Sequence, residues 1–132
     1  MQTGLLDTSV FIANETNRPL GSFPDEVAIS VVTIGELELG VLRAESPTTR
    51  RRRRTTLELA RAFEPLPITE ATMSAWATIV SACRNAGVSK SIKLMDSLIA
   101  ATALQHGLAV ITQDSDFALI AESIPELDVH LV

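Results

Sequence analysis

The sequence predicts an α/β fold in which a central, mainly parallel β-sheet is flanked by α-helices on both faces. Short apolar runs of about four residues alternate along the chain with longer helical segments, an order typical of parallel strands joined by crossover helices. Hydrophobic residues make up 46% of the 132 residues and charged residues 20%, a balance typical of globular proteins. We therefore expect one domain, residues 1–132, that folds without a metal or a disulfide. We therefore expect any bound metal to take part in a reaction and not to be needed for folding.

The first elements of the chain form a strand, a helix and a loop. Residues 4–7 are predicted to form a short buried strand that ends on a carboxylate. Thr8 or Ser9 is expected to cap a short helix over residues 10–15. Residues 17–23 contain both proline and glycine and are predicted to be a loop.

The second group of elements is richer in helix. Residues 27–30 form a second apolar strand, and residues 32–44, rich in Leu, Glu and Val, form a helix. The Ser-Pro pair at residues 46–47 is expected to break the helical pattern before a long charged helix over residues 49–63. Residues 66–68 contain a proline, which favours an edge strand over a central one.

The last part of the chain alternates helices with strands. Residues 69–85 are predicted to form a helix with an acidic first turn and a glycine stop. A helix over residues 92–106 is almost wholly apolar and also ends at a glycine. Residues 109–112 form the clearest buried strand. A short helix over residues 116–121 and a final strand over residues 128–131 complete the predicted fold.

Composition excludes several classes of protein. Cys83 is the only cysteine, so there is no intramolecular disulfide framework and no thiolate zinc cage. His106 and His130 are too few and too far apart to suggest a zinc-ligand pair. The chain shows no signal peptide and no apolar run of membrane-spanning length, so we expect a cytoplasmic protein without membrane contact. Tyrosine is absent and the net charge is -5, which argues against a base-stacking platform or a general nucleic-acid coat.

Three aspartates occupy positions that suggest a site. Asp7 and Asp114 follow predicted strands, at the sheet edge where open α/β sheets bind ligands, although either could simply cap the next helix. Asp96 lies in the apolar helix, where an unpaired buried carboxylate costs several kcal/mol and so must be protonated, paired or metal-bound. The alternatives for Asp96 are a favourable position at the helix dipole or a salt bridge to Lys93 or Lys90.

Further acidic residues extend this group. Glu36 is three residues after Thr33, which has the form of a capping box, and the pattern does not decide whether Glu36 or Glu38 points inward. Asp116 could be a ligand, an acid behind the ligands or a helix-start residue. Several carboxylates at one edge, with almost no histidine, indicate an oxygen-ligand site for Mg²⁺ or Mn²⁺. The residues alone therefore favour an enzyme that acts on phosphoryl groups with the help of a bound metal ion.

Four segments together resemble a known family. Residues 6–12 (LDTSVFI), 31–37 (VVTIGEL), 96–101 (DSLIAA) and 110–117 (VITQDSDF) resemble the PIN domain in order and spacing. With the total length, they are most similar to the VapC toxins of bacterial and archaeal toxin–antitoxin modules. The resemblance covers essentially the whole chain and implies the PIN-like form of the α/β fold.

The resemblance assigns roles by position. It implies a metal-binding, catalytic quartet, selecting Glu36 over Glu38, with one further acid and two small polar residues that hold water near the site. The quartet is Asp7, Glu36, Asp96 and Asp114; the further acid is Asp116; the polar residues are Ser9 and Thr112.

The resemblance also implies a function. Similar proteins are Mg²⁺- or Mn²⁺-dependent endoribonucleases, in which a metal-activated water attacks the phosphodiester of structured RNA such as tRNA or rRNA. They typically form homodimers and are inhibited in hetero-oligomers by a cognate VapB antitoxin whose tail occupies the active site. The alternatives are a PIN nuclease of housekeeping RNA processing, or a catalytically silent module that only binds RNA or protein. Four costly carboxylates kept together argue against the silent module.

Two other features have open interpretations. Five consecutive arginines point around the whole circumference of a helix, so they form either a solvated helix end or a patch that contacts RNA phosphates or an acidic antitoxin segment. The run consists of Arg50, Arg51, Arg52, Arg53 and Arg54.

Met73, Trp76 and Ile79 have helical spacing and are expected in the core or in dimer packing.

Overall fold

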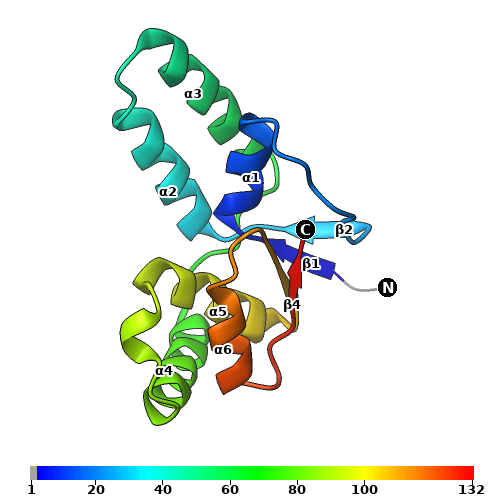
Figure 1. Cartoon of the computed structure of the whole chain (residues 1–132), viewed down its shortest axis with the longest axis vertical. Coiled ribbons are helices and arrows are strands. Elements are labelled where there is room, and N and C mark those ends of the chain that lie inside the picture. Colours follow the sequence, from blue (N-terminus) through cyan, green and yellow to red (C-terminus); the bar gives the residue numbers. More distant parts are fainter. Residues whose placement is uncertain (1–2) are drawn as a thin grey trace.

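A computed structural model describes residues 3–132 and contains a four-stranded sheet with strand order β2-β1-β3-β4 (Figure 1). Every adjacent pair of strands is parallel, so the predicted parallel sheet is confirmed. The elements are β1 (Thr3–Leu6), α1 (Thr8–Glu15), β2 (Glu26–Ala28), α2 (Val31–Leu42), α3 (Pro47–Arg61), α4 (Glu70–Asn85), η1 (Ser89–Ser91), α5 (Leu94–His106), β3 (Ala109–Thr112), α6 (Phe117–Ser123) and β4 (Val129–Leu131).

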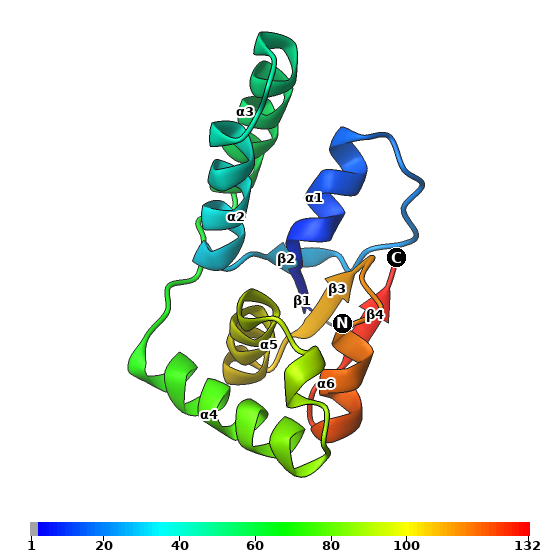
Figure 2. The same cartoon turned by 60° about the vertical axis from the view of Figure 1, so that its left-hand side comes forward.

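Helices cover both faces of the sheet, as the apolar runs predict. In β1, Leu5 packs into a core with residues of α4, α5 and α6, whereas the next residue, Leu6, packs into a second core with residues of α1, α2 and α3. In β3, Val110 joins the first core and Ile111 the second. This alternation follows from the two-residue period of a strand. Figures 1 and 2 show the two groups of helices on opposite sides of the strands.

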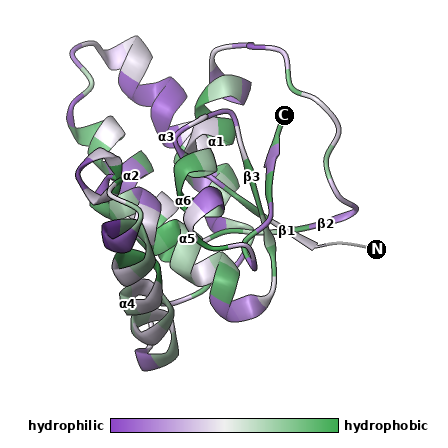
Figure 3. Cartoon of the chain, turned by 60° about the horizontal axis from the view of Figure 1, so that its bottom comes forward, coloured by the Kyte–Doolittle hydropathy of each residue, from purple (hydrophilic) through white to green (hydrophobic). Residues whose placement is uncertain are grey.

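Helices α2 and α3 form a hairpin that extends away from the sheet (Figure 2). Arginines of α3 hold it together: Arg53 Nη1 donates to the carbonyl oxygen of Gly40 at 2.7 Å, and Arg50 Nη2 donates to that of Ala44 at 3.1 Å. These carbonyls lie at the end of α2 and just beyond it, where the helix leaves acceptors unpaired. Figure 3 shows the hydrophilic colour concentrated on α3 and the hydrophobic colour along α5.

Two helix starts differ from the prediction. Asp7, not Thr8 or Ser9, caps α1, because its Oδ2 accepts the backbone N–H of Ser9 at 3.3 Å. Helix α3 begins at the Ser-Pro pair that was expected to break the pattern. Ser46 caps it with its hydroxyl, and Pro47 fits the first helical position because no N–H partner is needed there.

Residues 66–68 do not form the predicted edge strand. Leu66 makes only an isolated parallel bridge with Ser30, through Leu66 N to Ile29 O at 2.9 Å and Val31 N to Leu66 O at 3.0 Å. The following residue, Pro67, has no N–H with which to continue a ladder.

Helix α5 begins two residues later than predicted, at Leu94, after the short 3₁₀ helix η1. Lys93 is its N-terminal cap in an extended conformation, and Gly107 ends it in the left-handed region at φ 65°, which favours glycine. The buried face of α5 accounts for its apolar sequence. Within residues 3–132, no helix combines the length and apolarity needed to cross a membrane.

Candidate metal centre

The acidic residues singled out in the sequence meet at the carboxyl edge of the sheet. Asp7 directly follows β1, and Asp114 is two residues beyond β3. Asp96 lies in the first turn of α5, Glu36 lies in the first half of α2, and Asp116 immediately precedes α6. Because all four strands run in the same direction, the elements that follow them bring these side chains to one place.

Three of the carboxylates are close enough to hold one ion. Asp96, Asp114 and Asp116 each offer an oxygen within 4.8 Å of the oxygens of the other two. Asp7 and Glu36 complete the group, because both carboxylates act electrostatically on Asp96. The structure thus brings together all five acids that the sequence indicated.

Thr112 connects two of these acids. Its hydroxyl donates to Asp7 Oδ2 at 2.9 Å and accepts the backbone N–H of Asp114 at 2.9 Å. The hydroxyl of Ser9 lies 3.1 Å from Thr112 Oγ1 and accepts the N–H of Gln113 at 3.0 Å. The two predicted polar residues therefore lie directly behind the carboxylates and fix the loop after β3.

A second pair of hydroxyls, at Thr8 and Thr33, was missed as part of the site. Thr8 Oγ1 donates to Glu36 Oε1 at 2.6 Å and lies 3.0 Å from Thr33 Oγ1. These contacts join positions 28 and 25 residues apart, so no local motif encodes them. The only sequence signal is that a threonine directly follows Asp7.

The structure decides between the alternatives for Glu36. Ser30, not Thr33, caps α2, since its hydroxyl accepts the N–H of Val32 at 3.0 Å. Glu36 is therefore free of capping and points to the acid group, whereas Glu38 is exposed and pairs with Arg61 at 3.8 Å.

Asp96 has neither of the salt bridges considered as alternatives. Among the described residues no cation comes within 4.0 Å of its carboxylate, although the charge of Lys93 acts on it. Asp96 is 9% exposed, and its Oδ2 is buried without a hydrogen-bond partner in residues 3–132. Burial, followed by the charges of Asp7, Asp114 and Glu36, raises the pKa of Asp96 to about 7.

Glu36 is destabilised as an anion in the same way. Burial is the largest cause that raises its pKa, and the Asp7 charge adds to it, while the Thr8 hydrogen bond and Lys93 act in the opposite direction. A group of acids with raised pKa values and an unpartnered buried oxygen is the environment that a bound cation would neutralise. The oxygen-only donor set suits Mg²⁺ or Mn²⁺.

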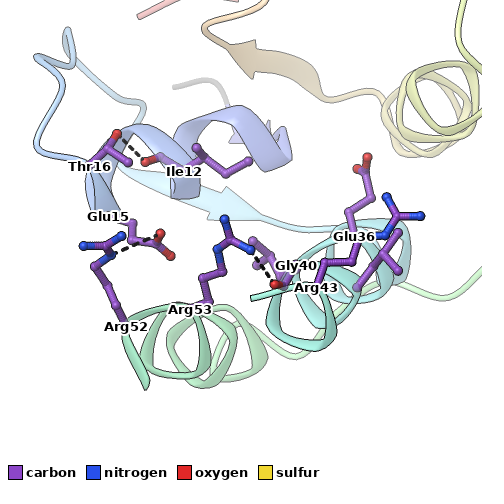
Figure 4. A pocket seen from close by; sticks show the side chains of 10 residues that line it. Ile12, Glu15, Thr16, Glu36, Gly40, Arg43, Arg52 and Arg53 are labelled. Atoms are coloured by element: carbon purple, nitrogen blue, oxygen red, sulfur yellow. Dashed lines mark hydrogen bonds and ion pairs between the residues drawn. The ribbon is translucent and has the colours of Figure 1, made fainter. Parts of the chain in front are cut away.

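A groove starts beside this group and runs between α1, α2 and α3 (Figure 4). Its volume is about 360 Å³, and Glu36 lines it together with Ile12 and Leu39, which are 41% and 45% exposed. Two arginines of the run also line it: Arg52 pairs with Glu15 at 3.6 Å, and Arg53 bonds the end of α2. The arginine run therefore lies along the groove and outside the acid group.

Comparison with known proteins identifies the class. The sequence description of the PIN domain matches residues 4–123, which is most of the chain. The chain therefore belongs to the PIN domain family.

Within that family, the chain is similar to proteins of one group, the VapC ribonucleases. The chain is 55% identical to Ribonuclease VapC8 of Mycobacterium tuberculosis over 100 residues, which are 76% of this chain and 89% of that protein. It is 46% identical to Ribonuclease VapC4 of the same organism, over 98% of this chain and 96% of that protein. The crystal structure of VapBC-5 from M. tuberculosis, a member of the VapBC family of toxin–antitoxin systems, matches over the whole of both chains with a TM-score of 0.88 and 36% identity. The predicted resemblance to the VapC group is thereby confirmed.

Proposed function

We propose that this chain is a divalent-metal-dependent endoribonuclease and the toxin of a VapBC-type module, acting in the cytoplasm on structured RNA such as tRNA or rRNA. The observation that carries the proposal is the convergence of Asp7, Glu36, Asp96 and Asp114, where Asp96 Oδ2 is buried and has no hydrogen-bond partner in the part of the chain that the structure describes. A fold without a ligand would gain stability by replacing such a group, so its presence supports a cation site. Relatives named as ribonucleases support RNA as the substrate.

The residues present fit a bound Mg²⁺ or Mn²⁺. Asp96, Asp114 and Asp116 would hold it most directly, and Asp7 and Glu36 are close enough for their charges to act on Asp96. When bound, such an ion neutralises charge on the phosphate and makes water a stronger nucleophile at neutral pH.

The chain's own residues set the geometry around that ion. Thr112 holds Asp7 and the loop of Asp114 in fixed positions, and Thr8 does the same for Glu36. Lys93 lies one helical turn before Asp96, and its charge reaches both Asp96 and Glu36. Its ammonium group is therefore placed to contact a phosphate oxygen that approaches the acids.

The partner that we propose is a VapB-like antitoxin, bound to a homodimer of this chain in a hetero-oligomer. The structural relative from M. tuberculosis is described as a toxin–antitoxin system, which supports such a partner. The groove of Figure 4 has an apolar floor at Ile12 and Leu39 and ends at Glu36, so an antitoxin segment lying in it would reach the acids. The guanidinium groups of Arg43 and Arg52 at its rim would favour acidic side chains on that segment.

The test is cleavage of total RNA by the purified chain. We expect cleavage with Mg²⁺ or Mn²⁺ and none with EDTA. Asp96→Asn should reduce the cleavage rate at least about 100-fold, because even residues behind metal ligands typically contribute 10–100-fold. The matched control is Asp25→Asn, which removes one carboxylate from an exposed loop outside the acid group.

Two outcomes would contradict the proposal. One is cleavage by Asp96→Asn at the wild-type rate. The other is wild-type cleavage that persists in EDTA, which would leave the acids without a metal to hold. For the first outcome, the thermal unfolding transition of Asp96→Asn shows whether the comparison was made on folded protein.

A further inference from the structure

A second cavity lies between α4, η1 and the start of α5. Its volume is about 310 Å³, at the small end of the roughly 300–1,000 Å³ that is typical of ligand sites. Trp76, Ile79 and Cys83 of α4 provide an apolar wall, and Leu94 and Ser97 of α5 also line the cavity. Ser97 directly follows Asp96 in α5, and none of the five carboxylates of the acid group lines the cavity.

The indole of Trp76 is fixed in this wall. Its Nε1 donates to the hydroxyl of Ser97 at 3.0 Å, and that hydroxyl donates to the carbonyl oxygen of Leu94 at 2.6 Å. Trp76 is only half-buried, in contrast to Ile79 on the same helix, which is completely buried. The expectation of core packing therefore holds for Ile79 and also for Trp76, which packs against the same core while it lines the cavity. A ring held in position loses little entropy when a ligand binds.

Basic residues contribute to this part of the molecule. Arg84 and Lys90 line the cavity, and the charge of Lys93 acts on Asp96. Lys90 and Lys93 are the only two lysines of the chain. None of these three cations has an ion pair within 4.0 Å in the described part of the chain. This differs from the arginine run, where three of five guanidinium groups already bond other parts of the molecule.

We infer that this cavity is a subsite for one unpaired nucleobase of the RNA, stacked against Trp76, with the neighbouring phosphates held by Arg84 and Lys90. The inference rests on the proposed function, because RNA is the proposed substrate and the start of α5 contributes residues both to the cavity and to the acid group. A volume of about 310 Å³ accommodates one flat aromatic ring system. The positive rim complements a sugar-phosphate strand, and stacking accepts any base.

The experiment uses the intrinsic fluorescence of the wild-type protein in EDTA, where cleavage is prevented. Trp76 is the only tryptophan and the chain has no tyrosine, so the emission reports this cavity alone. We expect saturable quenching by single-stranded octaadenylate. An abasic ribose-phosphate oligomer of the same length should bind more weakly and leave the emission unchanged, because it has no ring to stack.

Variants separate stacking from charge. Trp76→Ala should weaken the binding of fluorescein-labelled octaadenylate, followed by anisotropy, about 5- to 100-fold, the range expected for one stacked base. Trp76→Phe keeps an aromatic ring and should bind more tightly than Trp76→Ala, which also controls for loss of folding. Lys90→Gln should weaken binding, whereas Arg18→Gln, a matched charge removal in the exposed loop after α1, should not.

Three results would overturn the inference. The first is anisotropy that shows binding while the emission of Trp76 stays constant. The second is equal binding by Trp76→Ala and the wild type. The third is emission that changes with protein concentration in step with dimerisation measured by sedimentation, which would make the cavity an interface between copies. If the wild type fails to cleave RNA with added metal, the proposed function fails instead, and that result comes from a separate assay.

Discussion

Charged side chains are concentrated at the acidic edge of the sheet and at the arginine-rich hairpin. Partners within the fold bind three of the five arginines of the run at the hairpin, whereas at the acidic edge one carboxylate oxygen has no such partner among the described residues. At the hairpin, Arg50 and Arg53 bond carbonyl oxygens at the end of α2, and Arg52 pairs with Glu15. At the acidic edge, neighbouring hydroxyls orient some carboxylate oxygens, but Asp96 Oδ2 is buried without a partner among the described residues. One charged region thus stabilises the fold, whereas the other destabilises it in the absence of a ligand.

The difference shows which charged groups point to function. A run of five arginines is the most conspicuous feature of the sequence, yet two of them bond within the hairpin and a third pairs with Glu15 of α1. Lys90 and Lys93 are inconspicuous in sequence, but Lys90 lines the Trp76 cavity and the charge of Lys93 acts on the acids, and neither forms an ion pair within residues 3–132. Groups whose charge the fold leaves uncompensated are the better candidates for contact with a substrate.

The largest expected effect concerns the stability of the metal-free protein at different pH values. The pKa of Asp96 rises from its ordinary value of 3.8 to about 7 in the folded state, so the folded chain holds the proton more tightly than the unfolded chain. The free energy of unfolding should therefore fall as pH rises from about 4 to about 7, by an amount on the order of 2–4 kcal/mol. Urea unfolding in EDTA at several pH values measures it. Asp96→Asn should flatten the curve in this window, and an equally steep curve for that variant would assign the effect elsewhere.

A somewhat smaller effect is expected on the cleavage rate when the Thr112 hydroxyl, which orients the acids, is removed. Thr112→Val keeps the shape of the side chain but removes the hydrogen bonds to Asp7 and to the loop of Asp114. Cleavage at saturating Mg²⁺ should fall about 10- to 100-fold, as is typical when a group that orients metal ligands is lost. Thr78→Val is the control, because that hydroxyl bonds only the backbone of its own helix at Ser74. Equal rates for the two variants would show that the acids need no such support.

The comparison also explains what could be predicted from sequence. The strands that end at Leu6 and Thr112 and the helix that contains Asp96 were predictable, because apolar runs and glycine stops are local signals. Parallel strand direction predicted that Asp7 and Asp114 would share one edge of the sheet, whereas the full quartet came from the family resemblance. The family resemblance selected Glu36 over Glu38, which local pattern could not do.

Contacts between distant parts of the chain were beyond such reasoning. The Thr8–Glu36 hydrogen bond and the Trp76–Ser97 hydrogen bond join positions 28 and 21 residues apart, and nothing in either local segment specifies its partner. The same limit applies to Arg53, whose guanidinium finds the end of α2 only after the hairpin has formed. Two helix starts were wrong for a different reason. Asp7 competes with Thr8 and Ser9, which also cap helices, and a Ser-Pro pair such as Ser46-Pro47 also occurs in turns.

The hairpin itself gives the next test. Arg53→Met keeps the apolar stem but removes the hydrogen bond to Gly40, leaving carbonyls at the end of α2 without that donor. We expect a loss of about 1–2 kcal/mol in the free energy of unfolding, in the range for a hydrogen bond from a charged group that is partly exposed to solvent. Arg54→Met, which removes an exposed guanidinium from the same helix, should change it by less than about 0.5 kcal/mol. A larger loss for Arg54→Met would show that the run acts through its collective charge and not through single contacts.

The smallest expected effect distinguishes the basic residues at the Trp76 cavity from those of the arginine-rich hairpin. If Lys90 holds a phosphate, Lys90→Gln should reduce the slope of log affinity against log salt concentration for an RNA oligomer by about 1, since one fewer counterion is released. Arg54→Gln removes the same charge from the hairpin and should leave the slope unchanged, because long-range attraction from an exposed site is screened by salt. Anisotropy titrations in EDTA between 50 and 200 mM salt, roughly the range over which such slopes are measured, give both values. The opposite order, with Arg54→Gln lowering the slope and Lys90→Gln not, would move the RNA strand to the arginine hairpin and leave the Trp76 cavity to another ligand.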